Sequence, residues 1–230
     1  MIYKIISNFN KILRRILVGS YRQERISSEI CKIIVEMKPK NNIRILDYGS
    51  GFFKPSLAKL IHENLKKEKI ISNFICLDFY ETTQLEALNT QEEIKYMNLK
   101  ELDNFNYKCD FCVIADTLHH IGNGVENIDN LSKLLNKLKK NCEHFVIKDH
   151  FEYDLISRKL LQILDFFGNY QNKTNLPRRY FTRDLFNELI NKSDLKIIKL
   201  VDGQKYYKWF FLFFNNPKFH FISLLKKNDK

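Results

Sequence analysis

A turn with two glycines follows a short apolar strand near residue 50 and limits the possible folds more than any other feature. Residues 43–51 read IRILDYGSG, and a helix-like segment begins near Pro55. Glycine has no Cβ, so backbone N–H groups in such a turn can approach a ligand closely. The dinucleotide fingerprint needs a third glycine where Lys54 stands, which disfavours NAD. The turn predicts a nucleotide-type cofactor site, and the alternative is a strand-to-helix turn that binds nothing.

A second acid closes the next predicted strand. Residues 73–78 read NFICLD, and Asp78 ends the run. A doubly wound sheet places its ribose-binding acid at this position, because a carboxylate can accept hydrogen bonds from both vicinal hydroxyls. Asp78 is therefore the predicted ribose-binding residue, and the alternative is an ordinary acid at the start of a turn.

Predicted strands and helices alternate along the first 150 residues, and two further strands follow. Strands are predicted at 44–47, 73–78, 93–97, 110–116, 143–148, 195–201 and 218–225, and helices at 25–37, 55–67, 128–139 and 154–167. This order predicts an α/β fold with a doubly wound, Rossmann-like, mainly parallel sheet of seven strands. The last two strands are expected to form a C-terminal antiparallel pair.

Two segments resemble the class I S-adenosylmethionine-dependent methyltransferases. The first is the acid, any residue, Gly, any residue, Gly pattern at 47–51, although the family's usual third glycine is replaced by Phe53. The second reads ADTLHHI at 115–121 and is similar to the segment that closes strand four in small-molecule members with a Leu-His-His run. The resemblance covers roughly residues 22–226. It implies S-adenosyl-L-methionine as cofactor and methyl transfer to an O or N atom of a small-molecule or lipid-like acceptor.

Ligands of such sheets bind beyond the carboxyl ends of the strands, and the residues at those ends form the candidate site. The expected cofactor contacts are Asp47, Tyr48, Gly49, Ser50, Gly51, Asp78, Phe79, Asn98, Ala115 and Asp116. The expected catalytic group is His119, His120, Asp149 and His150. In plant-type O-methyltransferases the His after the Leu is the general base, and its counterpart is His119. A neutral imidazole can take a proton near neutral pH; the alternative is a packing or capping role.

The chain is predicted to divide into a basic amphipathic helix at 1–24 and a methyltransferase domain at 25–230. Within the domain, residues 150–190 are expected to form an insertion on the acceptor side. Its candidate acceptor contacts are Tyr170, Arg178, Arg179 and Tyr180. Residues 1–23 contain five Lys or Arg residues and no acid, with apolar residues at helical spacing. Such a helix either packs over a sheet edge or lies on anionic lipid, which predicts peripheral membrane contact as one possibility.

The net charge of +11 does not by itself indicate a nucleic-acid partner, because lysines are spread along the whole chain. Residues 115–118 read ADTL and lack the Asn or Asp, Pro, Pro, aromatic motif of enzymes that methylate exocyclic amines. A nucleic-acid partner is therefore not expected. An RNA or DNA methyltransferase and a non-catalytic cofactor-binding subunit remain the alternatives.

Five cysteines without a signal-peptide pattern predict a reduced, cytoplasmic protein. Cys109 and Cys112 form a C-x-x-C pair, but residues three apart on a strand are expected on opposite faces. No combination of His, Cys and acidic residues has the spacing of a closed zinc site. No metal is therefore predicted.

Overall fold

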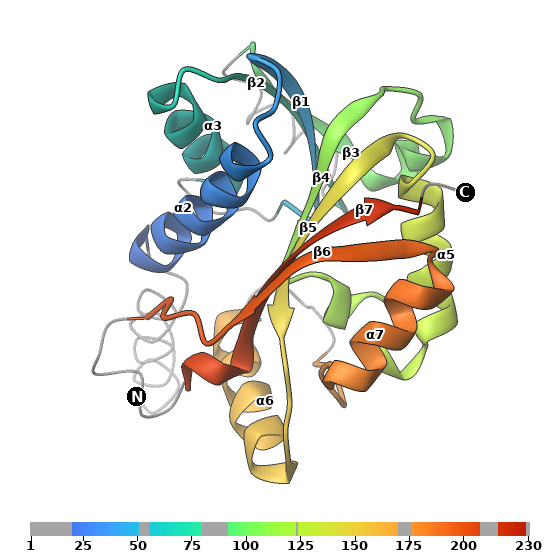
Figure 1. Ribbon diagram of the computed structural model, residues 1–230. Helices are drawn as coiled ribbons and strands as arrows, with labels where there is room; N and C mark the ends of the chain where they lie inside the picture. The colour runs from blue at the N-terminus through green and yellow to red at the C-terminus, as the bar shows by residue number, and fades with distance from the viewer. Residues whose placement is uncertain are drawn as a thin grey trace, which may run out of the picture.

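The computed structural model describes residues 20–50, 56–79, 92–122, 124–169, 176–207 and 216–228. The described residues form a seven-stranded sheet with the order β3-β2-β1-β4-β5-β7-β6 (Figure 1). The strands are β1 (Asn42–Tyr48), β2 (Ile71–Asp78), β3 (Ile94–Asn98), β4 (Cys109–Ala115), β5 (Cys142–His150), β6 (Leu195–Asp202) and β7 (His220–Lys227).

Strand directions confirm the predicted doubly wound sheet. Neighbouring strands among β1 to β5 run parallel. β7 runs antiparallel to both β5 and β6, as predicted for the C-terminal pair. β1 lies between β2 and β4, so the strand order reverses there, and this is where open α/β sheets bind ligands.

Helices cover both faces of the sheet. In Figure 1, α2 (Ser20–Glu36) and α3 (Leu57–Lys67) lie on one face, and α5 (Ile128–Leu138) and α7 (Arg183–Lys192) lie on the other. α6 (Leu155–Asn169) lies beyond the end of β5. Short 3₁₀ turns fill the connections: η1 (Leu99–Asn104), η2 (Leu118–His120), η3 (Gly124–Glu126) and η5 (Pro217–Phe219).

Local sequence explains where three helices begin. The side chains of Ser56, Asn127 and Thr182 cap α3, α5 and α7, each accepting a hydrogen bond from a backbone N–H three residues later, at 3.3, 3.1 and 3.2 Å. An N-cap oxygen satisfies an N–H that has no partner inside the helix, and it is worth about 1 kcal/mol.

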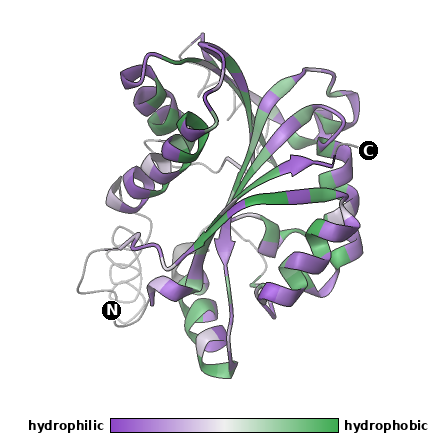
Figure 2. Cartoon of the chain, viewed as in Figure 1, coloured by the Kyte–Doolittle hydropathy of each residue, from purple (hydrophilic) through white to green (hydrophobic). Residues whose placement is uncertain are grey.

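The hydrophobic core has two layers, one on each face of the sheet. Ile30 and Ile34 of α2 and Ile61 of α3 pack against Ile45 in one layer. Leu131 and Leu135 of α5 and Phe186 of α7 pack in the other. Figure 2 shows hydrophobic residues along the central strands and hydrophilic residues on the outer sides of the helices. Both faces of the central strands are thus buried, which is typical of a parallel sheet.

Three details differ from the sequence predictions. α2 begins at Ser20, so the expected boundary between residues 24 and 25 falls inside a helix. α6 continues to Asn169 and does not stop at residue 167. Cys109 and Cys112 lie in the same core layer, on the side of α5 and α7, so their expected placement on opposite faces is wrong. Within the described ranges, no helix has both the length and the apolar character that crossing a bilayer requires.

Candidate functional site

The turn after β1 requires glycine at its first position. Gly49 has φ +75°, and its N–H donates to the carbonyl of Leu77 on β2 at 2.8 Å. A Cβ on Gly49 would lie 2.4 Å from Cγ2 of Thr117, the second residue after β4. The conformation and the space therefore both exclude a side chain. Gly51 lies outside the described residues.

Two carboxylates lie at the ends of β1 and β2. Asp47 is 1% exposed and Asp78 is 9% exposed. Asp78 accepts a hydrogen bond from the N–H of Phe79 at 2.6 Å. Burial, reinforced by the charge of Asp78, raises the pKa of Asp47 to about 7. Burial makes the ionised form of this carboxylate unfavourable, and a cationic group of a ligand bound beside it would stabilise that form.

Two polar atoms beside Gly49 have no hydrogen-bond partner. In the part of the chain that the structure describes, neither Oδ2 of Asp47 nor Oγ of Ser50 is hydrogen-bonded, although both residues are buried. Buried polar groups are normally paired, because an unpaired one costs about 1–3 kcal/mol. These two unpaired atoms lie next to a glycine turn at the point where the strand order reverses. They could bind a polar ligand that has both hydrogen-bond donors and acceptors.

The other predicted cofactor residues have varied surroundings. Tyr48 is buried in the core layer of α5 and α7. Phe79 is 74% exposed. Asn98 is opposite Asp78 in the strand register, and its side chain caps η1 through the N–H of Lys100 at 2.9 Å. Ala115 packs against the core layer of α2 and α3.

Asp116, which follows β4, lies at the centre of a group of ionic contacts. Its carboxylate accepts hydrogen bonds from Arg22 of α2 and from Lys148 of β5. Its backbone is left-handed, with φ 52°. Burial alone would raise the pKa of Asp116, but the two cations outweigh burial and hold it well below the usual range. The Nδ1 of His150 lies 3.5 Å from the same carboxylate.

The four predicted catalytic residues lie together, and Asp165 of α6 joins them. Nδ1 of His119 lies 2.5 Å from Oδ1 of Asp149, and Nε2 of His119 lies 3.3 Å from Oδ2 of Asp165. The ring centroid of His119 lies 4.0 Å from the ring centroid of His120 and 5.2 Å from that of His150. The backbone N–H of His150 donates to Oδ1 of Asp149 at 2.8 Å.

The charges of this cluster are strongly coupled. Burial alone would lower the pKa of His119, but Asp149 and Asp165 outweigh burial and raise it to about 10. In turn, His119 outweighs the burial of Asp165 and lowers the pKa of that carboxyl to about 2. Burial and the nearby Lys148 lower the pKa of His150. In this state His119 carries a proton at neutral pH, whereas a general base must be neutral before it acts.

The four predicted acceptor residues have different surroundings. Tyr170 lies outside the described residues. Tyr180 is fully buried, and its hydroxyl donates to Oδ2 of Asp165 at 2.6 Å. Nε of Arg179 donates to Oε1 of the buried Glu152 at 3.2 Å. Arg178 is exposed.

Sequence reasoning missed Arg22, Glu152 and Asp165 as members of this region. Asp165 carried a usable signal, because it is the acid in the otherwise apolar run at 163–167. Arg22 looked like any other basic residue of the N-terminal segment. Nothing local marked Glu152, whose carboxylate also binds Arg158 at 2.8 Å.

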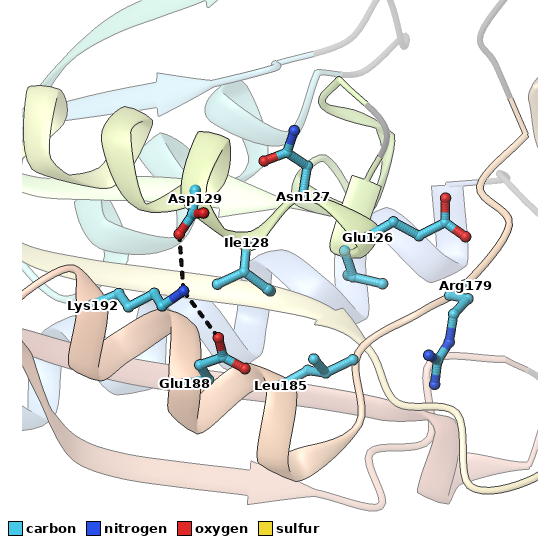
Figure 3. Close-up of a pocket in the computed structure, with 9 residues that line it drawn as sticks. Glu126, Asn127, Ile128, Asp129, Arg179, Leu185, Glu188 and Lys192 are labelled. Carbon is cyan, nitrogen blue, oxygen red and sulfur yellow. Dashed lines mark hydrogen bonds and ion pairs between the residues drawn. The ribbon is translucent and has the colours of Figure 1, made fainter.

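A separate pocket of about 460 Å³ lies between α5 and α7. Figure 3 shows Lys192 bridging Asp129 and Glu188 at one end, with Glu126 and Arg179 at the other. Residues of β1 and β2 do not line it. It is therefore distinct from the cofactor side of the candidate site.

Solved structures relate the fold to methyltransferases. An S-adenosylmethionine-dependent methyltransferase from Clostridium acetobutylicum is 12% identical with a TM-score of 0.56, and the match covers 97% of this chain and 99% of that one. Magnesium protoporphyrin IX methyltransferase from Synechocystis, solved with bound S-adenosylmethionine, is 11% identical with a TM-score of 0.53, covering 90% and 80%. Mitomycin 7-O-methyltransferase is 12% identical with a TM-score of 0.56, covering 81% and 49%.

These likenesses show the fold, and they confirm the predicted Rossmann-like sheet, which these solved methyltransferases share. The chain spans about half the length of mitomycin 7-O-methyltransferase and of the pyocyanin biosynthetic protein, 49% and 55% respectively. No model of a known protein family matches the sequence. No curated protein matches it either.

Proposed function

We propose that this chain is an S-adenosylmethionine-dependent methyltransferase that methylates an O or N atom of a small-molecule or lipid-like acceptor. The observation that carries the proposal is the group of buried polar atoms on Asp47 and Ser50 beside the Gly49 turn, with Asp78 at the end of the next strand. The fold of the solved methyltransferases supports it, and so does the Leu-His-His run at 118–120.

Each residue of the cofactor side has a role that suits its chemistry. Asp78 would accept hydrogen bonds from the ribose hydroxyls. The carboxylate of Asp47 would pair with the ammonium group of the methionine part, and Ser50 would donate to its carboxylate. S-adenosylmethionine supplies a sulfonium methyl group, whose transfer releases a neutral thioether and needs no acid. The chain must hold the acceptor in line with that methyl group. Holding the two reactants together in this geometry lowers the activation free energy by several kcal/mol.

The cluster after β4 and β5 is the proposed acceptor end of the site. Of His119, His120, Asp149 and His150, His150 has a lowered pKa and is the neutral imidazole that can take the proton which a hydroxyl or ammonium group must lose before it attacks. His119 would have to lose its own proton before it could act as the base. His120 and Asp165 are partly exposed, with 12% and 15% of their side-chain surface accessible, so a ligand can reach the cluster. This access favours an enzyme over a non-catalytic cofactor-binding subunit.

Calorimetric titration of the Asp78→Asn variant with S-adenosylmethionine tests the cofactor site. Loss of two charge-assisted hydrogen bonds should weaken binding by about tenfold to a hundredfold. Asp103→Asn is the matched control, because that side chain is 82% exposed on η1. Unchanged affinity in Asp78→Asn would remove this residue from the site. Formation of S-adenosylhomocysteine with a panel of phenols, amines and lipid alcohols tests the activity itself.

A further inference from the structure

Three side chains outside the cofactor side bring metal-binding atoms together. A ring nitrogen of His119, a ring nitrogen of His120 and a carboxylate oxygen of Asp165 all lie within 4.8 Å of one another. We infer that His119, His120 and Asp165 form a binding site for a divalent transition metal of the zinc type. The sequence spacing does not reveal this site, because Asp165 lies on α6, far along the chain from η2.

The position of His119 is the strongest evidence. Its side chain is fully buried, and Nε2 forms no hydrogen bond among the described residues, although Oδ2 of Asp165 is only 3.3 Å away. The carboxylate of Asp165 is therefore not in line with an N–H bond on Nε2 of His119. Two ligands about 2.1 Å from a zinc ion at the tetrahedral angle lie about 3.4 Å apart. The measured spacing suits two ligands of one metal ion better than a hydrogen bond.

His119 and Asp165 also have the hydrogen-bond partners that metal ligands usually have. A metal-binding histidine almost always donates its other ring N–H to a carboxylate, and Nδ1 of His119 faces Oδ1 of Asp149 at 2.5 Å. A metal-binding carboxylate is usually also hydrogen-bonded, and the hydroxyl of Tyr180 donates to Oδ2 of Asp165 at 2.6 Å. Nε2 of His120 lies 4.0 Å from Oδ2 of Asp165, so a small side-chain rotation would complete the set.

The donor set indicates which metals fit. Two imidazoles and one carboxylate suit zinc and similar divalent ions, whereas magnesium and calcium prefer oxygen ligands alone. The carboxylates of Asp149 and Asp165 balance the two charges of such an ion. Binding releases the proton from Nε2 of His119, because only the neutral imidazole is a ligand. Three protein ligands leave a fourth position open, which an acceptor oxygen could occupy.

The test uses the full chain after treatment with a chelator. Calorimetric titration with zinc chloride should show one ion per chain, and elemental analysis after gel filtration should give the same ratio. Asp165→Asn and His120→Gln should each weaken zinc binding by at least tenfold. Tyr180→Phe should weaken it by about tenfold, in the range for residues that hold a ligand in place. His62→Gln is the matched control, because His62 lies on α3 and contacts Ser72.

Visible absorption of the cobalt-substituted protein provides a second readout that does not depend on activity. Cobalt d–d bands should appear with the wild-type chain and be lost with Asp165→Asn, while circular dichroism confirms that the variant is folded. Absence of stoichiometric zinc binding by the folded wild type would overturn the inference. Equal zinc affinity in wild type, Asp165→Asn and His120→Gln would overturn it as well. Neither outcome bears on cofactor binding, so the site can fail while the proposed function stands.

Discussion

Asp47 connects protein stability with ligand binding at the scale of a single residue. Its carboxylate is buried at the end of β1, beside the charge of Asp78, and its Oδ2 has no partner among the described residues. The ionised form of Asp47 is therefore unfavourable in the ligand-free protein until a cationic group pairs with it. Binding sites often carry such a cost, because the groups that bind ligand are not arranged for stability.

The first prediction is that Asp47→Asn stabilises the ligand-free protein at pH 8 more than at pH 5. The folded-state pKa of about 7 lies above the ordinary 3.8, so the folded state holds this proton more tightly than the unfolded state. The stability from Asp47 is therefore fully present below about pH 4 and is lost as the pH rises through 7. The free energy of unfolding falls by at most about 4 kcal/mol over this pH range. Urea unfolding at the two pH values measures it.

Asp103→Asn serves as the exposed control for Asp47→Asn, and its effect should not change between pH 5 and pH 8. If the stability difference between Asp47→Asn and wild type were the same at both pH values, the buried charge would not be the cause. The same variant should also bind S-adenosylmethionine more weakly, since an amide cannot form an ion pair with the ammonium group.

The second prediction concerns Gly49, for which the chain contains a matched control. Gly49 and Gly203 have φ values of +75° and +77°, but a Cβ at Gly203 would meet nothing within 4 Å. Gly203→Ala should cost about 1–2 kcal/mol for the left-handed conformation alone. Gly49→Ala should cost about 1–3 kcal/mol more, because its Cβ overlaps Thr117. Chemical denaturation measures both variants.

The contact with Thr117 can be separated from the backbone effect. Adding Thr117→Ala to Gly49→Ala removes the two atoms nearest to a new Cβ, Cγ2 and Oγ1 of Thr117, so the double variant should recover part of the lost stability. If Gly49→Ala and Gly203→Ala cost the same, the close approach to Thr117 would carry no energetic weight. Cofactor affinity should fall only in the variants of Gly49 and Thr117.

At the scale of elements, buried polar contacts link the beginning and the end of the segment between β5 and α7. Oε2 of Glu152 accepts a hydrogen bond from the backbone N–H of Tyr180 at 3.0 Å, and the carboxylate also binds Arg158 and Arg179. Phe151 pairs with Phe181 in an isolated parallel bridge. These contacts join the start of α6 to the approach to α7. They hold residues 151–152 and 179–181 against each other.

The third prediction separates binding of the acceptor from stability within this segment. Arg178→Ala should raise the acceptor KM by about tenfold and leave cofactor affinity unchanged, because this exposed side chain is proposed to contact the acceptor alone. Arg179→Ala should also lower the free energy of unfolding, because it leaves Glu152 with one cation fewer. Steady-state kinetics and denaturation measure the two effects. A parallel loss of acceptor and cofactor binding in Arg178→Ala would indicate a folding defect.

At the scale of the whole molecule, ionic contacts tie distant parts of the chain together at the carboxyl ends of the strands. Arg22 of α2 and Lys148 of β5 meet at Asp116 after β4. Nζ of Lys148 also lies 3.4 Å from Nδ1 of His220 at the start of β7. Breaking one partner of a buried pair is costly, so these contacts should hold α2 against the sheet.

The fourth prediction is that the N-terminal segment binds anionic membranes weakly and reversibly. Residues 1–19 lie outside the described part of the chain, so this proposal rests on the basic amphipathic sequence. Each Lys or Arg near an anionic surface is worth about 1 kcal/mol. The protein should float with phosphatidylserine vesicles at low salt and be released at high salt. Replacing Lys11, Arg14 and Arg15 by Gln should abolish flotation.

Replacing the exposed lysines at 66, 67 and 69 by Gln is the matched control, since it removes the same charge from the end of α3. Flotation of this control together with wild type would assign binding to the N-terminal segment. Equal losses in both variants would indicate that net charge alone is responsible. No flotation of wild type at low salt would leave only a helix that packs on the domain.

The sequence by itself determined the features that depend on neighbours along the chain. Apolar runs, glycine turns and capping residues are local, and they predicted the order of strands and helices, the turn at Gly49 and the acids at the ends of β1 and β2. The same local evidence placed His119, His120, Asp149 and His150 at one edge, because parallel strands end on the same side of a sheet.

Only the tertiary structure decided which distant groups meet there. Arg22 reaches Asp116 because α2 packs across the sheet, and Asp165 faces His119 because α6 lies beyond the end of β5. No local pattern encodes such contacts, since they depend on how crossovers and helix packing orient whole elements. Cys109 and Cys112 make the same point, because strand alternation predicted opposite faces and both pack in one core layer. The electrostatics of the site therefore follow from packing, which local sequence does not specify.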